Sequence, residues 1–245
     1  MPDAYLSRPG NISPNIAFPD PNDRPAVSTD IAVLTLTPER ELAVVLIDLD
    51  GQRQLPGTFM MPGETLKKSA RRALSECLTL EVGEIHLLDV LDEPARDPRG
   101  WMLSISFFAA VPYSAVELLL AEEHGPNPPY PLALVPVSDL HVTSFTANQS
   151  QVIEQAVDKI THEYALRPDP YYFIPAEEVT LFDLRNVHEI VRGKKILKDN
   201  FRRRMTPHLL DTGHVTQGRL GKPARLYRRR QVRVPRPPAQ ETSLG

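Results

Sequence analysis

Cysteine is almost absent from this 245-residue sequence, in which Cys77 is the only one. A single cysteine excludes a disulfide within the chain and any zinc site built from several thiolates. No apolar run approaches the roughly 18 residues of a membrane-spanning helix, and the first residues lack the basic and apolar regions of a secretory signal. We therefore expect a cytoplasmic protein with no membrane partner, no resident metal and no required cofactor.

Charge is distributed very unevenly, although the net charge is only -3. Residues 185–236 contain 16 lysines and arginines against three acidic residues, a net charge of +13. The remaining 12 basic and 28 acidic residues give the rest of the chain a net charge of -16. A basic segment on an acidic body predicts a polyanionic partner for that segment, and the alternative is a solvated basic face.

Proline marks the predicted domain boundaries. Residues 1–27 contain six prolines and little periodicity, which predicts a flexible N-terminal arm. Three prolines in residues 167–177 separate a first domain at 28–166 from a second at 167–234. Residues 235–245 are predicted to be a disordered tail. With 41% hydrophobic residues, both domains have material for a core.

Hydrophobic periodicity predicts an α+β chain. In the first domain we expect a strand pair at 28–37 and 41–50, a loop at 51–64 and an amphipathic helix at 65–80 with Thr65 as its N-cap. We then expect strands at 86–93 and 102–112, a loop containing one strand at 125–140 and a long helix at 150–166. In the second domain we expect helices at 180–191 and 197–210 and a hairpin at 212–234.

The loop and helix at residues 57–80 resemble the Nudix box, G-x5-E-x7-R-E-U-x-E-E-x-G-U, in which U is aliphatic. Five of its nine fixed positions match: Glu64, Arg72, Leu74, Glu76 and Leu80. Four do not: Thr58, Ala73, Cys77 and Thr79. An ordinary amphipathic helix after a glycine- and proline-containing loop is the alternative. The resemblance implies an α/β/α sandwich with a mixed sheet, in which Arg72 orients Glu64.

The mismatches bear on catalysis. Nudix hydrolases cleave diphosphates with Mg²⁺, which prefers several oxygen ligands. Ala73 and Cys77 replace two of the family's carboxylates, and a thiol is a poor ligand for Mg²⁺. Spacing places positions 73, 76 and 77 on one helix face, so only Glu76 would present a carboxylate there. We therefore expect no enzymatic activity and no catalytic residues.

The DPRG loop at residues 97–100 resembles loops of Nudix domains that bind ADP-ribose-like ligands. The resemblance implies that Arg99 contacts a phosphate and that Asp97 orders the loop or a ribose, whereas the alternative is a tight Asp-Pro turn. We expect a ligand between the loops at 53–64 and 92–101, and packing in the core or an interface for Trp101. The predicted ligand-binding residues are Arg53, Thr58, Phe59, Glu64, Glu76, Asp97 and Arg99.

The basic second domain has the pattern of a winged helix-turn-helix. Its first helix is expected to bury Leu181, Leu184, Val187, Ile190 and Val191, and its second Ile196, Leu197, Phe201, Met205 and Leu209. Arginine and asparagine side chains on the exposed face of the second helix suit base edges, and cations on the hairpin suit phosphates. The predicted DNA-binding residues are Lys195, Lys198, Asn200, Arg202, Arg203, Arg204, Lys222, Arg225, Tyr227 and Arg228. A winged helix used for protein contacts is the alternative.

The combination over residues 28–230 resembles the NrtR family, the Nudix-related transcriptional regulators of NAD metabolism. Residues 200–203 and 221–228 are its most specific parts. The resemblance implies a homodimer on a palindromic double-stranded DNA operator, repression of NAD biosynthesis or salvage genes, and release by ADP-ribose or a related nucleotide. Two alternatives remain, an active Nudix hydrolase of ADP-ribose-like substrates with an accessory nucleic-acid-binding module and a protein-interaction scaffold.

Overall fold

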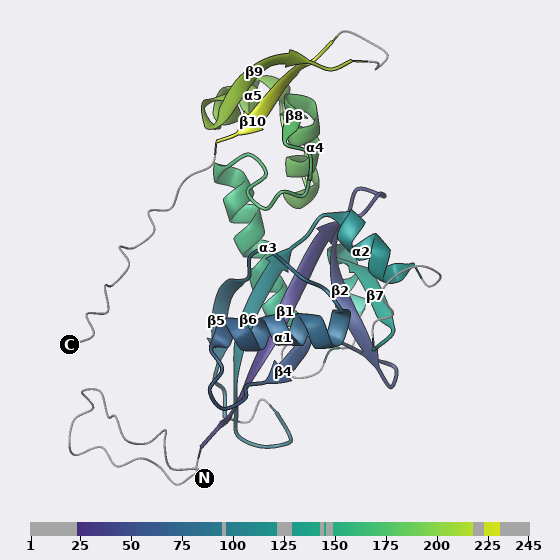
Figure 1. The fold of residues 1–245 in the computed structure, drawn as a ribbon, viewed down its shortest axis with the longest axis vertical. Coiled ribbons are helices and arrows are strands. Elements are labelled where there is room, and N and C mark those ends of the chain that lie inside the picture. The colour runs from purple at the N-terminus through teal and green to yellow at the C-terminus, as the bar shows by residue number, and fades with distance from the viewer. Residues whose placement is uncertain are drawn as a thin grey trace, which may run out of the picture.

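The computed structural model describes residues 24–94, 97–121, 129–142, 145, 149–217 and 223–230. The predicted tail at 235–245 and most of the predicted arm lie outside these residues. No helix in the described part of the chain has the length and apolarity to cross a membrane. The described chain forms a larger body and a smaller one, which the long helix α3 links (Figure 1).

The larger body is built on a seven-stranded sheet in which β1 pairs in parallel with β6 and antiparallel with β2. The other pairs are antiparallel, so the predicted mixed sheet is confirmed. The strands are β1 (Ala26–Leu36), β2 (Leu42–Leu49), β3 (Gln52–Gln54), β4 (Gly57–Phe59), β5 (His86–Leu91), β6 (Met102–Ala110) and β7 (Leu132–Pro136).

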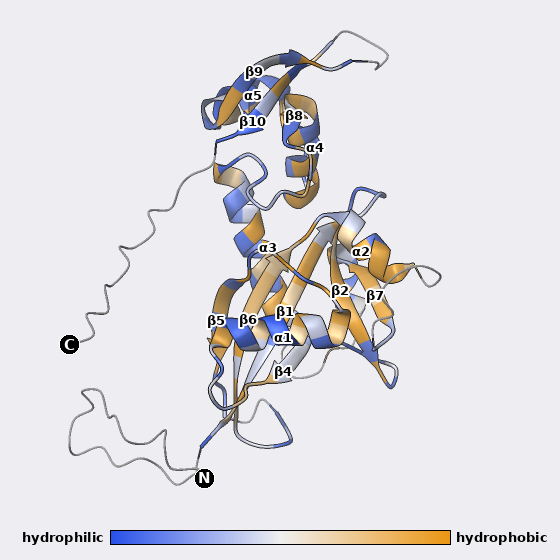
Figure 2. Ribbon diagram, viewed as in Figure 1, coloured by the Kyte–Doolittle hydropathy of each residue, from blue (hydrophilic) through white to orange (hydrophobic). Residues whose placement is uncertain are grey.

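Helices cover both faces of this sheet because its strands are apolar on both sides. In β1, Ile31 and Val33 pack with helices α1 (Leu66–Leu78) and α2 (Tyr113–Leu120), whereas Ala32 and Leu34 pack on the other face with α3 (Gln149–Leu166). Figure 2 shows the hydrophobic sheet between these layers and polar residues on the outward side of α1. The predicted α/β/α sandwich is thereby confirmed.

Local chemistry fixes the ends of α1. The Thr65 hydroxyl caps its N-terminus by accepting from the Lys68 amide at 3.3 Å, as predicted. Thr79 ends the helix in the left-handed region with φ 54°. That position is the final glycine of the Nudix box, so threonine adopts a conformation that glycine adopts without a steric cost.

The smaller body is a winged helix with a three-stranded sheet, in the order β8-β10-β9. Its elements are β8 (Glu178–Thr180), α4 (Leu181–Val191), α5 (Lys198–Met205), η4 (Thr206–His208), β9 (Leu209–Val215) and β10 (Arg225–Arg229). Thr180 and Asp183 form a capping box at the start of α4. Its core joins Leu184, Phe201, Met205 and Tyr227.

The structure corrects several predictions. The loop at 51–64 contains the short strands β3 and β4, and α2, the 3₁₀ helix η3 (Val137–Val142) and β8 were missed. The helix predicted at 197–210 ends at Met205 and passes into the 3₁₀ turn η4, because Pro207 has no N–H to continue the α-helical hydrogen bonds. Leu197, predicted in the core, is 74% exposed at the N-cap of α5. Trp101 is also exposed, so its packing in the core of this chain was a wrong prediction.

Candidate functional site

A cavity of about 680 Å³ opens in the larger body beside β1, β3, β4 and the loop before β6. Four of the seven predicted ligand-binding residues line it: Thr58, Phe59, Asp97 and Arg99. Arg53, Glu64 and Glu76 are not among its lining residues. Arg53 is absent from the lining because it precedes Gln54 in β3. Gln54 lines the cavity, and successive side chains of a strand point to opposite faces.

The loop at 97–99 is held rigid by its own side chains. The buried Asp97 carboxylate accepts from the Arg99 amide and Nε, both at 2.9 Å, and from Arg99 Nη2 at 2.8 Å. Hydrogen bonding to the Asp97 side chain raises the pKa of Arg99. The Arg99 guanidinium lies 5.8 Å from the centre of the Phe59 ring. The exposed Arg99 is therefore a preorganised cation above an aromatic ring at the edge of the cavity.

The cavity also has polar lining residues that the sequence analysis missed. Ser28, Asp30 and Gln149 line it, and Ser104 donates a hydrogen bond to the Asp30 carboxylate. A Cβ at Gly57 would lie 2.6 Å from Asp30 Oδ1, so glycine is needed there for β4 to pair closely with β1. The signal available in the sequence was the polar triplet at residues 28–30 before an apolar run, in which Ser28 and Asp30 point to the same face of the strand.

Arg72 organises the loop that carries Thr58 and Phe59. Its Nε donates to Glu64 Oε1 at 2.8 Å, and its other nitrogens donate to the Thr58 hydroxyl, the Phe59 carbonyl and Glu76. The Arg72 hydrogen bond, followed by the Met61 amide, lowers the pKa of Glu64 to about 2. Arg72 thus orients Glu64, which is the arrangement that the Nudix resemblance implied.

The helix does not offer the carboxylates that a Nudix metal site needs. Ala73 and Cys77 are buried in the core, where burial raises the pKa of the thiol and Cys77 Sγ lies 3.7 Å from the Gly57 carbonyl oxygen. Glu76, in contrast, is exposed to solvent. Arg72 holds the carboxylates of both Glu64 and Glu76. The described residues contain no group of three or more His, Cys, Asp and Glu placed to hold a metal ion, and the set present does not fit Mg²⁺.

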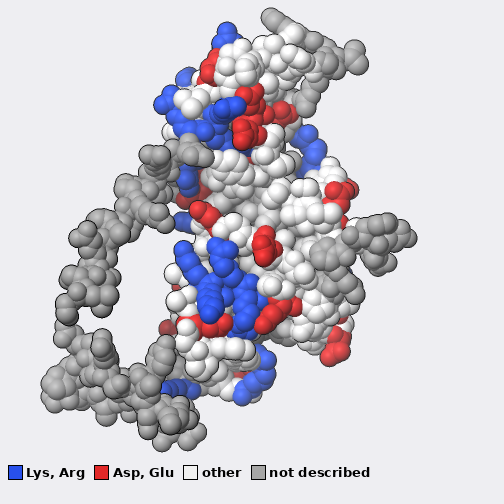
Figure 3. Space-filling model, viewed as in Figure 1, with Lys and Arg blue, Asp and Glu red and all other residues white. Residues whose placement is uncertain are grey.

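The second site is the exposed face of α5. Phe201 and Met205 hold this helix in the winged helix core, while its polar residues point outward. The exposed residues of α5 are Lys198, Asp199, Asn200, Arg202, Arg203 and Arg204. Arg203 donates to Asn200 at 3.2 Å, and within the described ranges none of the three arginines forms an ion pair with a carboxylate. Figure 3 shows Lys and Arg gathered on the smaller body around α5, with a second group over α1.

The other predicted DNA-binding residues differ from those of α5. Arg225 pairs with Asp211 at 2.7 Å, Arg228 with Glu178 at 3.0 Å, and Lys195 with Glu189 at 3.2 Å. Tyr227 is buried in the winged helix core. Lys222 lies outside the described residues. The cations of α5 are therefore free to meet phosphates or bases, whereas those of the hairpin are partly neutralised.

Comparisons with known proteins agree with this two-part architecture. A family model described as the NrtR DNA-binding winged helix domain matches residues 171–229. The chain is 24% identical over 216 residues to the ADPR responsive transcriptional repressor NtrR of Acinetobacter baylyi, an alignment that covers 83% of this chain and 82% of the relative.

Solved structures show the same arrangement. The structure of Shewanella oneidensis NrtR with a 27mer DNA matches with a TM-score of 0.68 and 28% identity, over 83% of this chain and 93% of that one. A MutT/nudix family protein of Enterococcus faecalis, at 19% identity, supports the fold alone with a TM-score of 0.63 over 88% of this chain and 90% of that one. The chain therefore carries a winged helix domain of the NrtR type and is similar to NrtR proteins over most of its length, as a DNA-binding transcriptional regulator in which a Nudix-like effector domain precedes a winged helix.

Proposed function

We propose that this regulator is a homodimeric repressor of NAD biosynthesis or salvage genes, which leaves its palindromic operator when ADP-ribose enters the Nudix-like domain. The observation that carries the proposal is a ligand-sized cavity with an organised cation at its edge, on a chain whose helix α5 exposes arginines that pair with no carboxylate among the described residues. The ADP-ribose response named for the Acinetobacter baylyi relative supports the choice of effector. A cytoplasmic location would accord with this role.

The cavity suits a nucleotide with two phosphates. Its volume of about 680 Å³ is within the range of small-molecule sites, roughly 300–1,000 Å³. Arg99 would bind a phosphate, Phe59 would contact the ligand through its ring, and Asp97 would keep Arg99 in place or bind a ribose hydroxyl. Glu64 and Glu76 would act through Arg72, which shapes the loop bearing Thr58, whereas Arg53 would contribute only to a ligand that extends past β3.

We further propose that the Nudix-like domain does not hydrolyse its ligand. Two of the positions that carry carboxylates in the Nudix box point into the core as Ala73 and Cys77. The remaining carboxylates are bound to Arg72, so a cation would have to displace an arginine before it could bind. A chain that binds ADP-ribose without cleaving it keeps the effector intact, as a sensor requires.

On DNA, α5 would enter the major groove, where arginine can bond guanine and asparagine can bond adenine in bidentate fashion. Lys195, Lys198, Asn200 and Arg202–Arg204 would make these contacts and those to the adjoining phosphates. Lys222, Arg225, Tyr227 and Arg228 would contribute from the hairpin. In a two-fold symmetric dimer the two α5 helices would meet half-sites about 34–36 Å apart.

Fluorescence anisotropy with a labelled DNA fragment from upstream of a neighbouring NAD-related gene tests the proposal. We expect tight, salt-sensitive binding that ADP-ribose reverses. Tight binding that ADP-ribose leaves unchanged would contradict the effector, and absence of specific binding would contradict the operator. A parallel phosphate-release assay with ADP-ribose and Mg²⁺ addresses catalysis. Robust turnover abolished by Glu76→Gln would establish the hydrolase alternative instead.

A further inference from the structure

A single buried carboxylate joins the two bodies of the molecule. Asp169 lies in the segment after α3, is fully buried and adopts a left-handed φ of 48°. It accepts hydrogen bonds from the Tyr164 hydroxyl on α3 and from the amides of Phe173 and Ile174 at 2.9 and 3.1 Å. Asp169 therefore fixes the connecting segment to the C-terminal end of α3.

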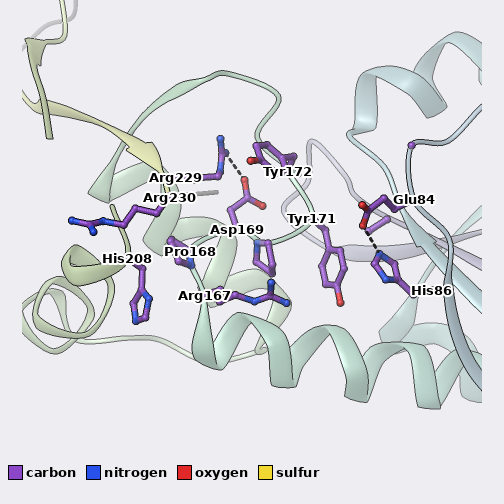
Figure 4. Close-up of a pocket in the computed structure, with 13 residues that line it drawn as sticks. Glu84, His86, Arg167, Pro168, Asp169, Tyr171, Tyr172, His208, Arg229 and Arg230 are labelled. Carbon is purple, nitrogen blue, oxygen red and sulfur yellow. Dashed lines mark hydrogen bonds and ion pairs between the residues drawn. The ribbon is translucent and has the colours of Figure 1, made fainter. Parts of the chain in front are cut away.

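Arg229 completes this joint from the winged helix. It belongs to β10, its side chain is almost wholly buried, and its Nη2 lies 2.5 Å from Asp169 Oδ2 (Figure 4). The same guanidinium donates to the carbonyls of Ile174 and Ala176 at 2.8 and 2.9 Å and lies 4.6 Å from the centre of the Tyr172 ring. One arginine thus ties the winged helix sheet to the segment that Asp169 holds against α3.

A row of rings makes a second connection from the same tyrosine. The Tyr164 ring packs edge-on against the ring of His188 in α4, with 5.0 Å between ring centres. The His188 ring in turn packs against Phe201 of α5, with 4.9 Å between ring centres. Tyr164 therefore contacts Asp169 through its hydroxyl, and through its ring it contacts His188, which packs against Phe201 of α5. Beside the joint, a cavity of about 670 Å³ separates His86 of the larger body from His208 of the smaller one (Figure 4).

The other end of α3 lies at the proposed effector site. Gln149, the first residue of α3, lines the cavity, and its Oε1 accepts a hydrogen bond at 2.9 Å from the amide of Leu55, another lining residue. Between its ends, α3 is packed against the sheet through Val152, Ile153, Ala156 and Ile160. A helix of 18 residues is about 27 Å long, so one packed rod spans the distance between pocket and joint.

We propose that α3 transmits effector binding to the winged helix, and that Asp169 and Arg229 are the positioning residues that make this transmission possible. A ligand that shifts Leu55 or Gln149 would move the N-terminal end of α3, and the joint would convert that movement into a new orientation of α5. With the Arg229 link cut, the ring contact between Tyr164 and His188 would remain, but the winged helix sheet would no longer be fixed to the segment that Asp169 holds against α3. This inference rests on the proposed function, because it concerns the path between the effector cavity and the DNA.

Arg229→Met tests the joint, because it removes the link to the winged helix but leaves Asp169 its three donors from Tyr164 and the backbone. Arg230→Met is the matched control, since the neighbouring Arg230 donates to the Leu209 carbonyl within its own domain. For each protein we would measure the operator Kd with and without saturating ADP-ribose, the ADP-ribose Kd by calorimetry, and thermal unfolding. Coupling of this kind usually changes affinity about 5–150-fold.

The ratio of interest is the operator Kd with ADP-ribose divided by the operator Kd without it. We expect this ratio to fall to within about twofold of 1 in Arg229→Met, while the ADP-ribose Kd of the variant stays within about threefold of wild type. Arg230→Met should keep the wild-type ratio. A folded Arg229→Met protein with the wild-type ratio would overturn this inference and leave the proposed function standing. If that variant unfolds without cooperativity, Tyr164→Phe decides: a lowered ratio supports the joint and an unchanged ratio overturns it. A wild-type ratio of 1 would overturn the proposed effector response, and this inference with it.

Discussion

Helices α1 and α5 have nearly the same charge composition, with four basic residues and one acidic residue each, yet they use it differently. In α1, Arg72 bonds Glu64 and Glu76, and Arg71 donates to the carbonyls of Val82 and Gly83. In α5, the arginines at 202–204 point outward, and none pairs with a carboxylate within the described residues. Composition alone therefore does not separate a structural helix from a ligand-binding one.

The difference arises from what surrounds each helix. The loop before α1 supplies Glu64, whose carboxylate neutralises Arg72 and leaves that guanidinium in a fixed position. Among the described residues no ion pair joins the arginines of α5 to a carboxylate, so these cations remain available to phosphates. Counterion release then favours DNA binding by α5, with an affinity that falls as salt rises.

The largest expected effect separates the two helices directly. The double variant Arg203→Ala with Arg204→Ala should bind the operator at least about 30-fold more weakly, because each base or phosphate contact contributes about 1–3 kcal/mol. The matched α1 double variant, Lys67→Ala with Lys68→Ala, should bind within about twofold of wild type. Fluorescence anisotropy at two salt concentrations measures both. Equal losses in the two double variants would show that overall charge, and not α5, governs binding.

A smaller effect is expected from the Arg72 cluster in α1. Arg72→Ala should lower the melting temperature by roughly 2–4 °C, the shift that a net loss of about 1 kcal/mol gives in a protein of this size. Operator affinity without effector should not change. Arg72→Lys keeps the charge but not the fork of donors, so it should restore only part of the loss. Calorimetric scans of the three proteins make the comparison, and identical melting curves would contradict the role of Arg72.

The same cluster predicts a pH dependence with a defined sign. The folded-state pKa of Glu64 is about 2, below its ordinary value of 4.5, so the stabilisation is complete above about pH 4.5. It is lost as pH falls from 4.5 towards 2, where Glu64 takes up a proton. The difference in melting temperature between wild type and Arg72→Ala should therefore shrink over that window. A difference that is constant from pH 7 to pH 3 would assign the effect to other contacts of Arg72.

Much of this contrast could be read from periodicity and spacing. Local patterns predict the hairpin of β1 and β2, the helix that Thr65 caps and the apolar face of α5. The Nudix resemblance predicts the hydrogen bond between Arg72 and Glu64. These features involve residues close in sequence or repeated at a fixed period. Local chemistry decides them before the chain is packed.

The parts that escaped prediction depend on distant partners. Asp30 and Gln149 reach the cavity only after β1 and α3 are placed on the sheet, and Arg229 finds Asp169 some sixty residues earlier. Short elements such as β3, β4 and β8 are stabilised by pairing with longer strands and carry little signal of their own. Leu197 had the spacing of a core residue, but the start of α5 turns it outward.

The smallest expected effect concerns the hairpin, where charges are paired as they are in α1. Asp211 accepts from Arg225 at 2.7 Å, and the pKa of Asp211 is lowered first by the Gly213 amide and then by Arg225. Exposed ion pairs contribute little to stability, so Asp211→Asn should fold normally. It should bind the operator about two- to fivefold more tightly, because Arg225 is released and a negative charge is removed near the phosphates.

The salt dependence decides whether Asp211→Asn acts through Arg225. If the released arginine neutralises one more phosphate, the slope of log K against log salt should steepen by up to about 0.9. Arg225→Ala should flatten that slope, and the double variant should gain nothing from Asp211→Asn, since the cation is then absent. An unchanged affinity for all three variants would place the hairpin away from the DNA. In that case α5 alone would carry the contacts, and the hairpin cations would be structural in the same sense as Arg72.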